Sequence, residues 1–136
     1  MAASKLVSKD VWEETLNRLF HASDDEFETA WGTIWAPELE GTFEGVTYDS
    51  DGVKALVRRL RSTVSKDAKN PVKVHYLLRD GNTFAERHSA KAALNDGREM
   101  NCAVYVFGEL NDDGLIRKFD EAVFMAGANP LKDATE

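Results

Sequence analysis

Apolar residues recur at helical spacing through the first third of the chain. Two stripes appear there, the first formed by Val11, Trp12, Thr15, Leu16, Leu19 and Phe20, and the second by Phe27, Ala30, Trp31, Ile34 and Trp35. Steps of three and four residues predict two amphipathic helices. Asp10 followed by Glu13 is a plausible start for the first helix, and Ser23 followed by Glu26 is a capping box for the second. Pro37 prevents simple continuation of the second helix.

A short extended segment, Leu39 to Phe43, separates these helices from a third. The apolar side of the third helix is formed by Val53, Leu56, Val57, Leu60 and Val64. Asp49, Ser50 and Asp51 precede it and suit a helix N-terminus, because their side-chain oxygens accept hydrogen bonds from free backbone N–H groups. The pattern therefore predicts three helices in the first half of the chain.

From Val72 onward the pattern changes to β-rich runs that are separated by Asp-Gly pairs. These pairs, at positions 80–81, 96–97 and 113–114, are strong signals for hairpin turns. We expect four antiparallel strands over about residues 72–79, 83–93, 99–110 and 115–125. Helices followed by a meander predict an α+β fold, with the helices packed on one face of a mainly antiparallel sheet.

The totals indicate one domain spanning residues 1–136, with a core from about residue 8 to 127 and flexible ends. The formal net charge of −7 argues against nucleic acid as a partner, because phosphate binding needs concentrated Lys and Arg. No uncharged apolar run is long enough to cross a bilayer, so a membrane is not expected either. Cys102 is the only cysteine, which excludes a disulfide framework, and a cytoplasmic location fits best.

Counting residues through the turns predicts which side chains share a face of the sheet. With tight loops at the first two Asp-Gly pairs and a four-residue loop at 111–114, Arg87 faces Val106 and Val104 faces Glu121. One face then carries Val72, Val74, Tyr76, Leu78, Ala85, Arg87, Ser89, Cys102, Val104, Val106, Phe119, Glu121, Val123 and Met125. The other carries Lys73, His75, Leu77, Phe84, Glu86, His88, Tyr105, Phe107, Lys118, Asp120 and Phe124. The aromatic residues of this second face suit a homodimer contact.

Four residues on the first face form the candidate catalytic group. Glu121 lies between apolar neighbours, which raises the pKa of a carboxyl group toward the range useful for proton transfer. Arg87 can position Glu121 or a substrate through its guanidinium group, and Ser89 and Tyr76 can hydrogen-bond a substrate oxygen. Arg87 and Glu121 are equally compatible with a structural ion pair.

Other chemistry receives less support from the sequence. Two histidines and a carboxylate, His75, Glu86 and His88, share the second face and are a known ligand set, but we predict no metal, because that face suits a dimer contact better. Cys102 is expected to be a small buried residue. The chain contains no phosphate-binding loop and no nucleophile elbow. We also expect no cofactor.

The order of elements, the helix start YDSDGVKALV and the final strand GLIRKFDEAVF resemble the nuclear transport factor 2 (NTF2)-like superfamily, over about Val11 to Met125. The closest resemblance is to SnoaL-like proteins, which include polyketide cyclases of secondary metabolism, and to limonene-epoxide hydrolase. The resemblance implies a curved sheet that forms a cone-shaped, cystatin-like barrel with an internal cavity. Fold alone does not fix the reaction.

Within this resemblance, Glu86-Arg87-His88-Ser89 is similar to the hydrolase strand Glu-Arg-x-Asp, and Asp120-Glu121-Ala122-Val123-Phe124 to its last strand. Arg87 then matches the bridging arginine and Glu121 the acid that activates water. Ser89 stands in place of the second catalytic Asp, which weakens the hydrolase interpretation. An isomerase or cyclase that needs one acid/base group fits what remains.

The sequence therefore predicts a cofactor-independent enzyme that binds a hydrophobic, oxygenated small molecule. Glu121, Arg87, Ser89 and Tyr76 are its predicted catalytic residues. Its predicted ligand-binding residues are Trp31, Trp35, Phe43, Val104 and Phe119. A non-catalytic ligand-binding or dimerisation module of the same fold is the alternative, and an epoxide hydrolase is a second one.

Overall fold

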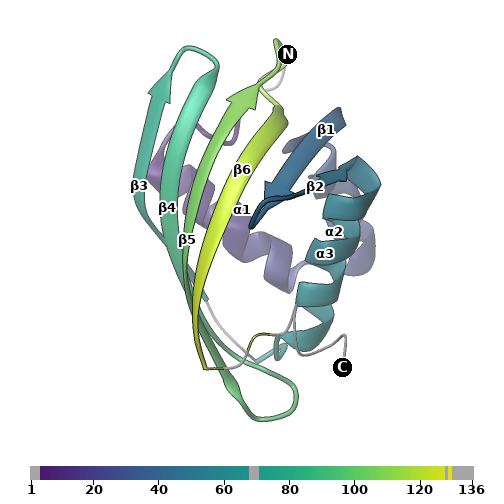
Figure 1. The fold of residues 1–136 in the computed structure, drawn as a ribbon. Coiled ribbons are helices and arrows are strands. Elements are labelled where there is room, and N and C mark those ends of the chain that lie inside the picture. The colour runs from purple at the N-terminus through teal and green to yellow at the C-terminus, as the bar shows by residue number, and fades with distance from the viewer. Residues whose placement is uncertain (1–3, 68–70, 128, 130–136) are drawn as a thin grey trace.

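The computed structural model describes residues 4–67, 71–127 and 129, and it has the predicted α+β class (Figure 1). The helices are α1 (Lys9–His21), α2 (Asp24–Trp31) and α3 (Ser50–Thr63). The strands are β1 (Trp35–Phe43), β2 (Val46–Asp49), β3 (Val72–Asp80), β4 (Thr83–Ala93), β5 (Glu99–Leu110) and β6 (Ile116–Gly127). The predicted flexible ends lie largely outside the described residues.

Each helix begins at a side chain that accepts a backbone hydrogen bond. Ser8, rather than the predicted Asp10, caps α1 and accepts from the Val11 N–H at 3.1 Å. The predicted Ser23–Glu26 capping box is confirmed: Ser23 Oγ accepts from the Glu26 N–H and donates to its carboxylate. Asp49 caps α3 by accepting from the Gly52 N–H at 2.9 Å.

The prediction that α2 continues through Ile34 to Trp35 is wrong. The helix ends at Trp31, Gly32 forms its C-terminal cap, and Trp35 begins β1. Both tryptophans nevertheless enter the core, because their rings stack with centroids 4.1 Å apart. The apolar spacing therefore predicted correctly that Trp35 is buried, but it assigned this residue to a helix instead of a strand.

The strands form one sheet in the order β2-β1-β6-β5-β4-β3. The four C-terminal strands are an antiparallel meander as predicted, whereas β1 pairs with β6 in parallel. The predicted extended segment at residues 39–43 is thus the end of a longer strand that lies between the edge strand β2 and β6.

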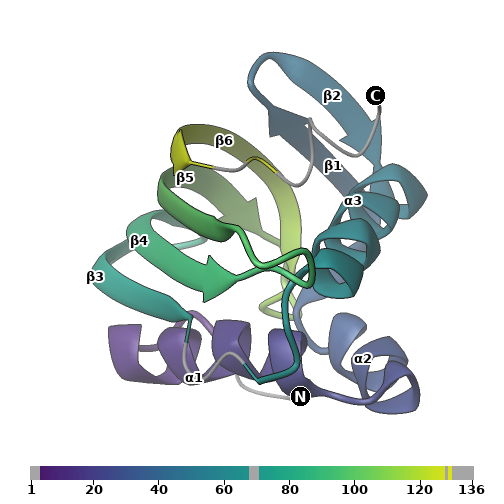
Figure 2. The same ribbon diagram turned by 90° about the horizontal axis from the view of Figure 1, so that it is seen from below.

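The sheet curves around the helices, which lie on its concave side (Figure 2). Helix α1 contacts β3, and α3 contacts β1 and β2. The core fills this concave side with residues such as Trp12, Phe27, Trp35, Phe84 and Phe119. Among the described helices, none is long and apolar enough to cross a membrane.

Two connections decide which side chains face the helices. The β3–β4 loop is tight, as predicted. A bulge between Val74 and Tyr76, however, interrupts the alternation of side chains along β3, so these two residues face opposite sides of the sheet. The β4–β5 loop spans residues 94–98 instead of two residues, so β4 shifts by one position against β5. Because side chains alternate, this one-residue shift turns all of β4 over relative to the prediction.

Candidate functional site

A cavity of about 170 Å³ lies between the concave face of the sheet and helices α1 and α3. Its lining is mostly apolar and includes Trp12, Leu16, Phe20, Trp35, Phe43, Leu56, Val57, Leu60, Val104, Val106, Phe119 and Met125. Four predicted ligand-binding residues, Trp35, Phe43, Val104 and Phe119, therefore line it. Trp31 is not part of the lining and lies behind Trp35, against which its ring stacks.

Glu121 of β6 reaches this cavity from the sheet. It is paired with Val106 on β5 and with Phe43 on β1, so its immediate neighbours on both sides are apolar. Its carboxyl group forms no hydrogen bond or ion pair with any residue in the described part of the chain. Burial, followed by the negative charges of Glu86 and Glu44, raises the pKa of Glu121 to about 8.

Glu44 belongs to the turn that joins β1 to β2. Its backbone has φ 49°, and the next residue, Gly45, has φ 84°, which gives the tight turn of a two-residue hairpin. The turn is held against β6 because the Glu44 N–H donates to the Glu121 carbonyl at 3.0 Å. The Glu44 carboxylate accepts from the Val123 N–H at 2.7 Å. One like charge is thereby fixed close to Glu121.

Glu86 and His88 of β4 also line the cavity. The Glu86 side chain is 1% exposed, and both of its carboxylate oxygens contact His88 Nδ1, at 2.8 and 3.0 Å. A carboxylate can only accept hydrogen bonds, so Nδ1 of His88 carries the proton. In the neutral ring, Nε2 is then the acceptor nitrogen. Nε2 has no hydrogen-bond partner among the described residues.

The predicted placement of Arg87, Ser89 and Tyr76 beside Glu121 is wrong. Arg87 is paired with Tyr105 and Ser89 with Ala103, on the convex face of the sheet. The longer β4–β5 loop is the physical reason, because it exchanges the two faces of β4. These three residues do share a face with one another, as predicted, but they share it away from the cavity.

On the convex face these residues have other partners. The Arg87 guanidinium lies 5.4 Å from the centre of the Tyr105 ring, Tyr76 is 62% exposed, and Ser89 Oγ hydrogen-bonds His75 Nε2 at 2.8 Å. The alternative ion pair between Arg87 and Glu121 is therefore not formed.

The convex position of His75 also separates it from Glu86 and His88. These three residues were the alternative metal-ligand set, and the structure places His75 on the other side of the sheet. No group of three or more potential ligands comes together within the described residues.

Sequence reasoning missed Glu86 and His88, although β4 contained a signal for them. Its even positions include Phe84, Ala90 and Ala92, and the pattern continues to Leu94, all of which are buried. Alternation within the strand therefore places Glu86 and His88 on the inner face, whatever the length of the turn.

Cys102 lines the cavity as a buried thiol, and burial raises its pKa, with a smaller contribution from the charge of Glu121. A thiol with a raised pKa is a poor nucleophile at neutral pH. The expectation of a small buried cysteine is confirmed.

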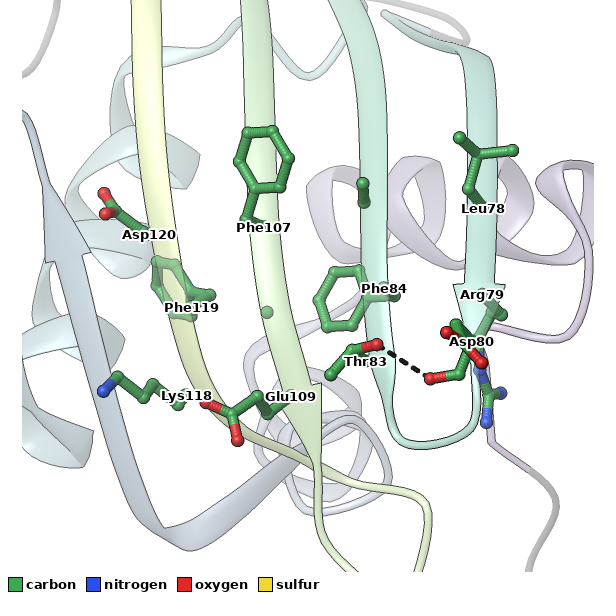
Figure 3. A pocket seen from close by; sticks show the side chains of 12 residues that line it. Leu78, Arg79, Asp80, Thr83, Phe84, Phe107, Glu109, Lys118, Phe119 and Asp120 are labelled. Carbon is green, nitrogen blue, oxygen red and sulfur yellow. Dashed lines mark hydrogen bonds between the residues drawn. The ribbon is translucent and has the colours of Figure 1, made fainter.

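A second hollow, of about 470 Å³, lies on the convex face of the sheet (Figure 3). Ala85 is small and lies between two large exposed residues, Leu78 and Phe107, in one cross-strand row. Lys118 and Asp120 line its β6 side. This hollow is larger than the cavity but more open to solvent, and we place the candidate chemistry in the less open cavity.

No family model matches the sequence, and no curated protein is significantly similar to it. The fold, in contrast, is shared with solved structures. An NTF2-like protein of unknown function from Exiguobacterium sp. 255-15 superimposes with a TM-score of 0.63 at 17% identity, over 85% of this chain and 97% of that one.

Two further structures belong to proteins with provisional assignments. A provisional SnoaL-like polyketide cyclase from Jannaschia sp. CCS1 gives a TM-score of 0.62 at 16% identity, over 92% of this chain and 90% of that one. A provisional isomerase from Rhodopseudomonas palustris gives 0.67 at 11% identity, over 86% and 90% of the two chains. The chain therefore has the NTF2-like fold that its sequence resembled.

Proposed function

We propose that this chain of NTF2-like fold is a cofactor-independent enzyme of the isomerase or cyclase type, acting on a hydrophobic, oxygenated small molecule. One observation carries the proposal: Glu121 presents an unpaired carboxyl group to an apolar cavity, and the pKa of that group is raised to about 8. At neutral pH Glu121 holds its proton and can give it to a substrate oxygen on which negative charge develops.

The geometry also supports an isomerase or cyclase over the two alternatives, a ligand-binding module and an epoxide hydrolase. A ligand-binding module needs no titratable group at the wall of its cavity. An unpaired carboxyl group there costs stability, and groups with strongly shifted pKa values cluster at functional sites. An epoxide hydrolase of the resembled type would need Arg87 and the position of Ser89 inside the cavity. Both lie on the convex face, so this structure favours the isomerase or cyclase over the hydrolase.

We also propose that the convex face pairs with a second copy of the chain. Leu78, Phe107 and Phe124 are each more than 60% exposed there, which is unusual for large apolar side chains gathered on one surface. The same face carries Arg87 and Lys118 as well as Glu109 and Asp120. A two-fold axis can therefore place opposite charges against each other around an apolar centre.

A panel of small oxygenated compounds tests the proposed activity. Cyclic ketones, phenols, lactones and epoxides are incubated with the protein in deuterated water, and mass spectrometry detects isomerised or deuterated products. Wild-type protein is expected to convert at least one compound. Glu121→Gln is expected to lower that rate by about 100-fold or more, the usual contribution of a proton-transfer group.

Two results would contradict the proposal. If wild-type protein converts no compound of the panel, the chain is not an enzyme of this type. If Glu121→Gln retains the wild-type rate, the activity does not depend on the carboxyl group. Thr83→Val, which alters a side chain of the convex face outside the cavity, serves as the matched control and is expected to retain full activity.

A further inference from the structure

Three carboxyl groups lie in or beside the cavity under the sheet. The Glu86 side chain lines it and is 1% exposed, and Glu121 lines it without a partner among the described residues. Glu44, in the β1–β2 turn, places a further negative charge close to Glu121. An ionised carboxylate in apolar surroundings is costly unless a positive charge lies against it. The question is therefore whether the protein itself supplies that positive charge.

The positive charge in the lining is already engaged elsewhere. Helix α1 contributes only apolar and aromatic side chains to the lining, and the other titratable or charged side chains there are Arg61 of α3, His88 of β4 and Cys102 of β5. The Arg61 guanidinium donates to the carbonyl oxygens of Leu19 and Ala22. His88 is held through Nδ1 by its carboxylate partner. Within the described part of the chain, the lining offers no free cation.

Aromatic rings surround the point where Glu121 enters the cavity. Phe43 of β1 is paired with Glu121, and Phe119 lies two residues before Glu121 on the same face of β6. The two rings meet edge-to-face, with centroids 5.2 Å apart. Trp35 adds a third ring to the lining. Because the face of an aromatic ring attracts cations, such walls suit an ammonium group.

The volume of the cavity limits the ligand to a small molecule. An apolar protein cavity of about 150 Å³ accommodates benzene. The present cavity, at about 170 Å³, is of similar size. It therefore matches one six-membered ring with a small head group.

We propose that the cavity binds a small hydrophobic amine as its ammonium cation, with Glu121 as the counter-ion. This inference goes beyond the proposed function and stands whether or not the chain is an enzyme. The ammonium group lies against the Glu121 carboxylate and beside the rings of Phe43 and Phe119, and the hydrocarbon part fills the apolar remainder of the cavity. Because the amine occupies the carboxyl group that the proposed reaction uses, it inhibits that reaction.

Binding of the cation moves one proton. Burial and the neighbouring negative charges raise the pKa of Glu121 to about 8, so the free protein holds a proton there at pH 7. An opposite charge within about 4–6 Å favours the ionised carboxyl group, so this proton passes to the buffer when the ammonium group binds. The affinity is therefore expected to rise about five-fold from pH 7 to pH 8 and to level off near pH 9.

The probe for this inference is cyclohexylamine, which has one six-membered ring and, like the lysine side chain, keeps its ammonium form to about pH 10. Cyclohexanol is its neutral counterpart of nearly the same shape. Isothermal titration calorimetry at pH 8.5 is expected to give an affinity about ten-fold or more higher for the amine. Titrations at pH 7 in two buffers with different heats of ionisation should show release of about one proton per amine bound.

Glu121→Gln keeps the shape of the side chain and removes its charge. The variant is expected to bind cyclohexylamine about ten-fold or more weakly at pH 8.5 and to release no proton, because the counter-ion is lost. Its affinity for cyclohexanol should stay within about three-fold of wild type, which reports an intact cavity. Glu40→Gln, which removes the same charge from an exposed position on β1, is the matched control and should leave both affinities unchanged.

Phe43→Leu tests the aromatic wall. The variant is expected to bind cyclohexylamine about three-fold more weakly than wild type, because an aliphatic side chain does not attract a cation as an aromatic ring does. The affinity for cyclohexanol should change less. An equal loss for both ligands would contradict the contact between the ammonium group and this ring.

The outcomes separate this inference from the proposed function. Equal affinities for the amine and the alcohol, or no binding of the amine, would overturn the inference. Amine binding without proton release at pH 7, or with full affinity in Glu121→Gln, would show that Glu121 is not the counter-ion. If the amine binds as expected and no compound of the panel is converted, the inference stands and the proposed function fails. Glu121-dependent conversion without selection of the amine would support the proposed function and overturn this inference.

Discussion

The two faces of the sheet depart from the usual distribution of side chains in opposite ways. The concave face carries Glu86 and Glu121 on either side of Val106, within an apolar cavity. The convex face exposes Phe107 and Phe124 to solvent. Burying an unpaired polar group costs stability, and large apolar side chains gathered on an exposed face mark an interaction surface, so each face indicates a use beyond the fold. We interpret the inner face as the chemical site and the outer face as the surface for a second copy.

Adjacent residues of one strand serve the two faces. Val106 and Phe107 are adjacent in β5, yet one lies between two acids in the cavity and the other borders the convex hollow. The backbone is the same extended strand on both sides, so alternation alone gives the two faces different chemistry.

The largest expected effect comes from placing the same charge on each face in turn. Val106→Asp adds a third carboxyl group to the cavity and is expected to lower the free energy of unfolding by about 3 kcal/mol or more. The matched variant Phe107→Asp leaves the charge in water and should cost the monomer less than about 1 kcal/mol. Denaturant unfolding checks both, and equal losses would contradict the assignment of the faces.

The pH dependence of stability tests the inner face alone. The folded state raises the pKa of Glu121 from 4.5 to about 8, so it retains a proton that the unfolded chain releases. The stability linked to this group is therefore complete below pH 4.5 and is lost as pH rises toward 8, by about 1.4 kcal/mol per pH unit.

Glu121→Gln removes this loss. The variant is expected to be more stable than wild type by up to about 5 kcal/mol at pH 9 and to match it at pH 4. Urea unfolding at the two pH values measures the difference. A Glu121→Gln protein that is less stable than wild type at pH 9 would argue against a costly buried carboxylate.

The outer face is tested by the oligomeric state. We expect wild-type protein to sediment as a dimer, and Phe107→Asp to weaken association by about 2 kcal/mol or more, the cost of losing an aromatic anchor and burying a charge. Val46→Asp, at an exposed position on β2, is the matched control and should remain dimeric. A monomeric wild type, or equal weakening by both variants, would remove the role proposed for this face.

The smallest effect is expected at Ser89. Ser89→Ala removes the hydrogen bond to His75 on the convex face and should lower the free energy of unfolding by about 1 kcal/mol. Enzymatic turnover should stay within about two-fold of wild type, because the side chain does not reach the cavity. A large loss of turnover with unchanged stability would restore the role that the sequence first suggested for Ser89.

Local patterns predicted much of the fold. The Ser23–Glu26 capping box and the Asp-Gly turns act over a few residues, so they indicated the helix start and the strand pairs correctly. Glu121 was identified for the same reason, since its apolar neighbours lie on its own strand.

The residues predicted to lie beside Glu121 depended on the strand register, and errors in the register accumulate over several turns. The β5–β6 register differs from the predicted one by two residues and keeps the faces, so Val104 and Val106 remained beside Glu121. The β4–β5 register differs by one, which exchanged Arg87 and Ser89 for Glu86 and His88. The parallel pairing of β1 with β6, which is remote in sequence, had no local signal.

The protonation state of Glu121 in solution is the most direct test of the central claim. Wild-type protein labelled with ¹³C at the glutamate side chains is titrated by NMR, and Glu121→Gln identifies the resonance by its disappearance. We predict that the Glu121 carboxyl group titrates with a pKa near 8 and is neutral at pH 7. A carboxyl group that is already fully ionised at pH 6 would contradict this account.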